Sequence, residues 1–198
     1  MSELPAARSG QPARREALLD AAFEALVQDG PHFRVERVAA RADASKALVY
    51  HHFGSREGLL DAMAGRVLAQ TQDGLERLVM DYPNPRERLD ALARTLLEEP
   101  RDSSPTEARR VHLFWMQDDA AGTCRGALRD SLIADFVSQT IHEGVALGVM
   151  RAPAAGADTI AVLLLGRWHG ATVQYAEARV VDFEREQERL VTDIGRAL

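Results

Sequence analysis

The chain is poor in cysteine, lysine and aromatic residues, and it carries no positive excess. A single cysteine, Cys124, among 198 residues excludes an intrachain disulfide and a cysteine-based metal site. The net charge of −6 argues against a protein that coats nucleic acid with its whole surface. The longest apolar run, residues 160–165, is too short to span a membrane, and the first residues lack the apolar core of a signal peptide. These absences predict a cytoplasmic protein.

Charge is distributed unevenly along the chain. Residues 1–60 carry eight basic and eight acidic side chains, whereas residues 61–198 carry sixteen and twenty-two and hold the whole negative excess. Lys46 is the only lysine. A neutral head on an acidic body is compatible with a protein that contacts DNA at one end.

Apolar residues recur at a spacing of three to four, which predicts helices throughout and no strands. The breaks at Gly30-Pro31 and Asp43-Ala44 separate three segments, whereas Pro85 and the capping signature Ser104-Pro105-Thr106-Glu107 begin later helices. The nine predicted helices lie at about 12–29, 35–42, 45–53, 55–80, from 85, from 105, 123–150, 157–178 and 182–197.

This order predicts an all-α chain in three parts. Residues 1–11 are expected to form a disordered tail, and residues 12–60 a three-helix helix-turn-helix domain that binds DNA. Residues 61–198 are expected to form a helical bundle.

Residues 45–53 have the pattern of a recognition helix. Val49 and Phe53 lie four residues apart and should face inward. The opposite face should carry Lys46, Ala47, Tyr50 and His51. A cation, a small residue and two long polar groups suit close approach to a DNA groove.

The segment from Arg15 to Leu60 resembles the TetR-type (tetracycline-repressor-like) regulators. The likeness is carried by Ala21-Ala22, Gly30, Val38-Ala39, Ala44-Ser45, Leu48-Val49-Tyr50-His51-His52-Phe53, Ser55-Arg56-Glu57 and Leu59-Leu60. Where that family usually has Thr, Gly and Lys, this chain has Phe33-Arg34, Asp43 and Arg56. Aspartate tolerates the left-handed backbone of a turn better than most residues.

The resemblance implies a sequence-specific repressor that binds double-stranded operator DNA as a homodimer and responds to a small-molecule effector. It also implies that residues 61–198 serve ligand binding and dimerisation. It implies base-edge contacts from Glu36, Lys46 and Ala47, and phosphate contacts from Arg34, Ser45, Tyr50, His51 and Arg56. Tyr50 could instead pack its ring against the first helix, and His52 is expected to serve in packing.

The helix at 157–178 is apolar on most sides, and the last helix carries an apolar stripe. In the family these two helices pair with their symmetry mates. The candidate dimer residues are Leu164, Gly166, Gly170, Phe183, Leu190 and Ile194. The alternative is a core helix buried within one chain.

A mainly apolar or aromatic effector is predicted to bind within the bundle. The candidate ligand residues are His112, Trp115, Met116, Phe136, Gln139, Trp168, His169 and Tyr175, each of which could instead serve only in core packing. Residues 110–115 have a faint likeness to the betaine-repressor branch, so a quaternary ammonium caged by the aromatic residues is the second alternative.

Evidence for catalysis is weak. Asp118-Asp119 has no partner carboxylate, Cys124 has no base placed beside it, and the six histidines form no helical metal pair. The glycines at 144 and 148 lack the Lys-Ser/Thr of a phosphate loop. No cofactor or metal is predicted, and an enzyme using the C-terminal cavity remains a remote alternative.

Overall fold

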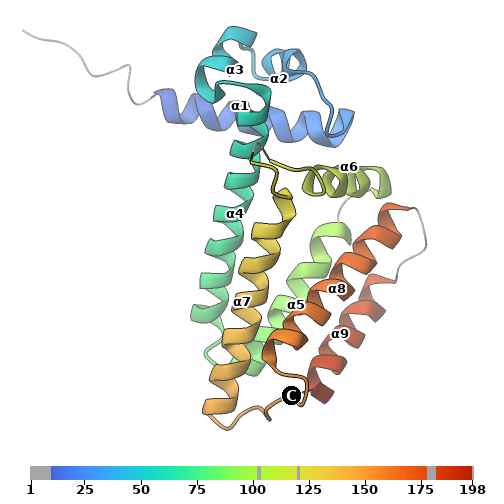
Figure 1. Cartoon of the computed structure of the whole chain (residues 1–198). Helices are drawn as coiled ribbons and strands as arrows, with labels where there is room; N and C mark the ends of the chain where they lie inside the picture. Colours follow the sequence, from blue (N-terminus) through green and yellow to red (C-terminus); the bar gives the residue numbers. More distant parts are fainter. Residues whose placement is uncertain (1–9, 102–103, 120, 178–181, 198) are drawn as a thin grey trace, which may run out of the picture.

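The structure is a computed structural model that describes residues 10–101, 104–119, 121–177 and 182–197 (Figure 1). Within these ranges the chain forms nine α-helices and no strand, which confirms the predicted fold class. They are α1 (Gly10–Asp29), α2 (Val35–Arg41), α3 (Lys46–Phe53), α4 (Arg56–Asp81), α5 (Pro85–Arg101), α6 (Pro105–Trp115), α7 (Arg125–Ala146), α8 (Ala157–Ala176) and α9 (Phe183–Ala197).

Two predicted boundaries need correction. Helix α1 begins at Gly10, so the last two residues of the predicted tail are helical, whereas residues 1–9 lie outside the described part. Helix α7 ends at Ala146 rather than 150, because Gly148 adopts a φ of +70°. The Val149 and Met150 N–H groups then donate to the Gly144 carbonyl at 2.9 and 3.1 Å.

Helices α1, α2 and α3 form a head at one end of the molecule (Figure 1). Its core extends past residue 60 into α4, as far as Ala64, and takes in Phe114 and Trp115 of α6. The other buried members come from the head helices, the loop between α1 and α2, and the start of α4: Leu18, Leu19, Ala21, Ala22, Ala25, Leu26, Phe33, Val35, Val38, Ala39, Val49, Leu59, Leu60 and Met63. By packing, therefore, α6 belongs to the head as well as to the body.

The body is a bundle in which α4 runs away from the head beside α7, with α5, α8 and α9 alongside (Figure 1). Its core is formed mainly by buried residues of α5, α7 and α8: Leu89, Leu92, Ala93, Ile133, Val137, Ile141, Ala157, Ile160, Ala161, Leu165, Trp168 and Ala171, with Leu75 of α4, Met150 and Ile194. No described helix is long and apolar enough to cross a membrane.

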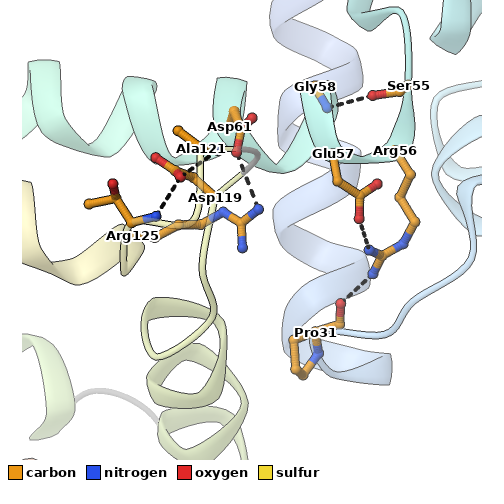
Figure 2. A network of polar contacts seen from close by, with 10 residues as sticks. Pro31, Ser55, Arg56, Glu57, Gly58, Asp61, Asp119, Ala121 and Arg125 are labelled. Atoms are coloured by element: carbon orange, nitrogen blue, oxygen red, sulfur yellow. Dashed lines mark hydrogen bonds and ion pairs between the residues drawn. The ribbon is translucent and has the colours of Figure 1, made fainter.

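Serine caps fix where the functional helices begin. Ser45 Oγ accepts from the Leu48 N–H at 3.1 Å at the start of α3, and Ser55 Oγ accepts from the Gly58 N–H at 2.9 Å at the start of α4 (Figure 2). Ser104 and Glu107 form the predicted capping box of α6.

Candidate nucleic-acid interface and internal pocket

Helix α3 has one buried and one exposed side, as predicted. Val49 is 1% exposed, and Phe53 packs against the head core. Asp43, which replaces the usual turn glycine, has a φ of +47°, so the predicted left-handed turn is confirmed. Arg14 Nη2 donates to the Asp43 carbonyl at 2.6 Å and ties α1 to this turn, a contact that sequence reasoning missed.

The opposite side of α3 is open. Ser45, Lys46, Ala47, Tyr50 and His51 are all exposed. Tyr50, at 37% exposure, does not pack its ring into the head core. The structure thus leaves five of the eight predicted DNA contacts exposed on α3 and its N-cap. Helix α3 lies at the outer end of the head (Figure 1).

Lys46 is held by an ion pair on this face. Its Nζ donates to Glu36 Oε1 of α2 at 2.5 Å and lies 5.7 Å from the Tyr50 ring centroid. The ammonium lowers the pKa of Glu36, and the carboxylate raises the pKa of Lys46, chiefly through this hydrogen bond. Both groups therefore remain charged near neutral pH, as a donor and an acceptor side by side.

The two predicted arginine contacts differ in their surroundings. Arg34 is exposed and is the N-cap residue of α2, but it provides no side-chain cap. Arg56 points toward the loop between α1 and α2, where its Nη2 donates to the Pro31 carbonyl at 2.5 Å (Figure 2). Its guanidinium also lies 5.6 Å from the Phe33 ring centroid. Arg56 thus has a structural role in the head that the sequence did not reveal.

A pocket of about 130 Å³ lies between α6, α7 and α8. Its wall is formed by Ala108, Val111, His112, Trp115, Met116, Gly126, Arg129, Asp130, Trp168, His169 and Thr172. Five of the eight predicted ligand residues therefore line it: His112, Trp115, Met116, Trp168 and His169.

Three predicted ligand residues lie outside this pocket. Phe136 and Tyr175 pack against the body core, and Gln139 is exposed. Sequence reasoning in turn missed the charged part of the wall, Arg129 and Asp130.

Arg129 stacks on both tryptophans of the pocket. Its guanidinium carbon lies 4.7 Å from the Trp168 ring centroid and 5.4 Å from that of Trp115. His169 Nε2 lies 3.3 Å from Asp130 Oδ1. Burial, and secondarily the nearby His169, lowers the pKa of His112 from its ordinary value of 6.5, which favours the neutral imidazole.

The predicted dimer residues do not form one surface. Gly166 is exposed and Gly170 is open, since a Cβ at either would meet nothing within 4 Å. Leu164 is partly buried against the body core. The assignment of Ile194 to the dimer interface is corrected: at 1% exposure, its side chain packs inside its own chain and cannot contact a partner. The side chains of Phe183 and Leu190 lie outside the described residues.

Two apolar residues that were not predicted are exposed on α8. Val162 and Leu163 are 64% and 61% exposed, near Gly166 and Gly170. We call Val162, Leu163, Gly166 and Gly170 the α8 outer face.

Among the described residues, no group of three or more histidine, cysteine, aspartate or glutamate side chains could hold a metal ion.

Residues 18–63 match the family model described as "Bacterial regulatory proteins, tetR family". The chain is 36% identical over 85 residues to the HTH-type transcriptional regulator BetI of Rhizobium meliloti, covering 42% of each protein. It is 32% identical over 106 residues to BetI of Burkholderia ambifaria, covering 52% of this chain and 54% of that relative. The chain thus matches about half the length of these relatives.

Solved structures match nearly the whole chain. A TetR transcription regulator from Haloarcula marismortui has a TM-score of 0.74 at 21% identity and covers 94% of this chain and 96% of its own. FadR of Bacillus subtilis, in complex with stearoyl-CoA, has a TM-score of 0.72 at 16% identity, and the match covers 92% of this chain and 98% of FadR. These identities establish a shared fold and extend the likeness to the body.

Proposed function

We propose that this chain is a TetR-type regulator, a homodimeric repressor that a small molecule releases from its operator. The observation that carries the proposal is α3, whose inner side is fixed in the head core and whose outer side presents Lys46, Ala47, Tyr50 and His51. A helix held in this way at the end of a domain suits the major groove.

The Glu36–Lys46 pair supports base reading rather than charge attraction alone. A lysine ammonium can donate to the acceptors of guanine, and a carboxylate can accept from the amino group of cytosine. Two opposite charges close together add little net attraction for phosphate. Ser45, Tyr50, His51 and Arg34 are then the candidates for phosphate contacts that set the register.

The α8 outer face supports dimerisation. Exposed Val162 and Leu163 lie beside two glycines that permit close helix approach. Apolar side chains of this size favour burial, and a two-fold axis would bring the same face of a second copy against them. Leu163→Glu should therefore give a monomer, whereas Leu128→Glu, at a similarly exposed apolar site on α7, should leave the protein dimeric. Monomeric wild-type protein at micromolar concentration in light scattering contradicts this.

Helix α6 supports a route from the pocket to the head. Three consecutive turns of α6 line the pocket with Ala108, Val111, His112 and Trp115, and Trp115 also belongs to the head core. Arg110 Nη1 donates to the Val27 carbonyl of α1 at 2.6 Å. A ligand that displaces α6 therefore shifts α1 directly, besides any movement of α4.

A second contact joins the start of α7 to the part of α4 that lies next to the head. Arg125 Nη2 at the start of α7 donates to Asp61 Oδ1 at 3.2 Å (Figure 2). Asp119 Oδ1 accepts from the Ala121 and Thr123 N–H groups, so this carboxylate shapes the loop before α7. We accordingly assign it no catalytic role and propose that the chain is not an enzyme.

Selection from random duplexes tests the proposal. The protein should enrich an inverted repeat and bind it at least about 1,000-fold more tightly than unrelated DNA. Enrichment of no sequence, or of an unsymmetrical single site, overturns the dimeric repressor.

A further inference from the structure

The pocket between α6, α7 and α8 combines an apolar wall with a half-buried carboxylate. Ala108, Val111 and Met116 contribute apolar surface. The side chain of Asp130, on α7, lines the same pocket and is 29% exposed. A charged group that is partly removed from water requires hydrogen-bond donors, so this carboxylate bears on the chemical class of the effector.

Asp130 has acceptor positions left for a ligand. Its Oδ1 lies 3.3 Å from His169 Nε2, but neither carboxylate oxygen accepts a hydrogen bond from a described residue. An ionised carboxylate offers about four acceptor positions. Since hydrogen bonds to a charged acceptor are the stronger ones, an O–H group of a ligand in the pocket gains from donating to Asp130.

Two further polar groups of the wall also accept hydrogen bonds. Thr172 Oγ1 donates its only proton to the Trp168 carbonyl at 3.0 Å, so the hydroxyl oxygen faces a ligand as an acceptor. The lowered pKa of His112 favours the neutral imidazole, which accepts at one nitrogen and donates at the other. Together with Asp130, these groups offer more acceptors than donors.

A net charge on the ligand is disfavoured by the same wall. An anion would face the Asp130 carboxylate, and the Trp168 Nε1 donor is buried, with no surface open to the pocket. Arg129 stacks its guanidinium 4.7 Å from the Trp168 ring centroid and 5.4 Å from that of Trp115. A cation of the protein therefore already occupies a face of each ring, which a quaternary ammonium would need. A neutral ligand meets neither obstacle.

We infer that the effector is a small neutral molecule with one ring, whose hydroxyl group donates a hydrogen bond to Asp130. The inference rests on the proposed function, since it names the ligand class of the same site. The pocket volume of about 130 Å³ is close to that of an engineered cavity of about 150 Å³ that binds benzene. Phenol meets these conditions, because a phenolic hydroxyl, with a pKa of about 10, stays protonated at pH 7.

Four ligands that each carry one ring test the inference: phenol, fluorobenzene, benzoate and benzylammonium. Fluorobenzene has nearly the shape of phenol but lacks the donor. Calorimetry on the full-length protein should show phenol binding at least about tenfold more tightly than fluorobenzene, and both ions binding more weakly than phenol. Tightest binding of either ion, equal affinities of phenol and fluorobenzene, or no binding of phenol at millimolar concentration overturns the inference.

Variants of Asp130 assign the contact. Asp130→Ala should abolish the preference for phenol over fluorobenzene, and Asp130→Asn, which keeps the size but not the charge, should reduce it to about threefold. Asp135→Ala, at an exposed position on the same helix and outside the pocket, is the matched control and should change neither affinity. If Asp130→Ala fails to fold, Asp130→Asn decides: an unchanged preference in a folded Asp130 variant overturns the inference.

Operator binding without and with saturating phenol is measured in parallel and separates the two proposals. Phenol should weaken binding to the selected operator at least about fivefold, and phenol that binds without changing operator affinity is not an effector and overturns the inference. Specific DNA binding combined with tightest binding of an ion overturns the ligand class alone. The expected preference for phenol in a chain that binds no operator supports the pocket assignment and overturns the repressor.

Discussion

Arg110 links α6, which lines the pocket, to the proposed DNA-binding head. Its removal should therefore weaken the coupling between ligand binding and operator binding. Its Nη1 donates to the Val27 carbonyl at 2.6 Å, and a Cβ at Gly30 would lie 3.6 Å from its Cγ. The contact therefore joins α6 to the end of α1. We expect Arg110→Ala to bind operator DNA but to respond poorly to ligand.

The size of the effect follows from this one hydrogen bond. A bond from a charged donor contributes about 1.5–3 kcal/mol, and the partial exposure of Arg110 places it near the lower limit. About 1.4 kcal/mol corresponds to a tenfold change in an equilibrium constant. Allosteric coupling is commonly about 1–3 kcal/mol, so loss of this bond removes much of a coupling of ordinary size.

Fluorescence anisotropy with a labelled selected operator measures the coupling as the ratio of operator affinities without and with saturating phenol, a probe with one ring, the size that the pocket of about 130 Å³ admits. Arg110→Ala should reduce that ratio about tenfold. Arg109→Ala, at the exposed neighbouring position, is the control and should keep the wild-type ratio. A folded Arg110→Ala protein whose ratio stays within about twofold of wild type would refute transmission through this contact.

Three further predictions follow from the head and the pocket. Lys46→Ala should relax base preference within each half-site, measured by competition with point-mutated operators, and a preference identical to wild type would exclude Lys46 from base reading. Gly58→Ala should lower the free energy of unfolding by about 1–3 kcal/mol in urea titrations, because the new Cβ would lie 2.1 Å from the Phe53 carbonyl oxygen. Gly65→Ala, which meets nothing within 4 Å, should not destabilise, and equal losses would contradict the steric explanation. Because the pKa of His112 is lowered in the folded chain, the unfolded chain takes up a proton near pH 6.5, whereas the folded chain takes it up only at lower pH. The free energy of unfolding should therefore fall as the pH drops below 6.5. The groups around His112 in the pocket are His169, Asp130 and Arg129, and His112→Gln should make this fall shallower; an unchanged pH profile would assign the fall to other groups.

The local structure of the head could be predicted because its signals are local. The turn at Asp43, the inward side of α3 at Val49 and Phe53, and the capping box at Ser104 each depend on residues within one or two helical turns. The sequence accordingly located the exposed face of α3 correctly.

The pocket was only partly predictable because periodicity gives the face of a helix but not its depth in the bundle. Phe136 shares a face with Arg129 but lies seven residues further along α7, about 10 Å away at the rise of an α-helix. The same distance separates Tyr175 from Trp168 on α8. Arg129 itself gave no signal, since no local pattern distinguishes an arginine that lines a pocket from a solvated one on the same amphipathic helix.

The sequence also could not show whether the apolar stripe on α9 packs within its own chain or against a second copy. Ile194 packs within its own chain because α9 lies against α5 and α8. Likewise, the contacts of Arg56 and Arg110 with the carbonyls of Pro31 and Val27 join residues 25 and 83 positions apart. No local pattern encodes such pairs.

Hydroxyl-radical footprinting on the selected duplex tests whether two copies of α3 read DNA together. Two protected regions should appear, related by a two-fold axis and separated by about one helical turn, 34–36 Å, or a multiple of it. Lys46→Ala should lose this pattern before it loses binding to unrelated DNA. A single protected region, or uniform protection that Lys46→Ala leaves unchanged, would contradict DNA reading by two copies of α3.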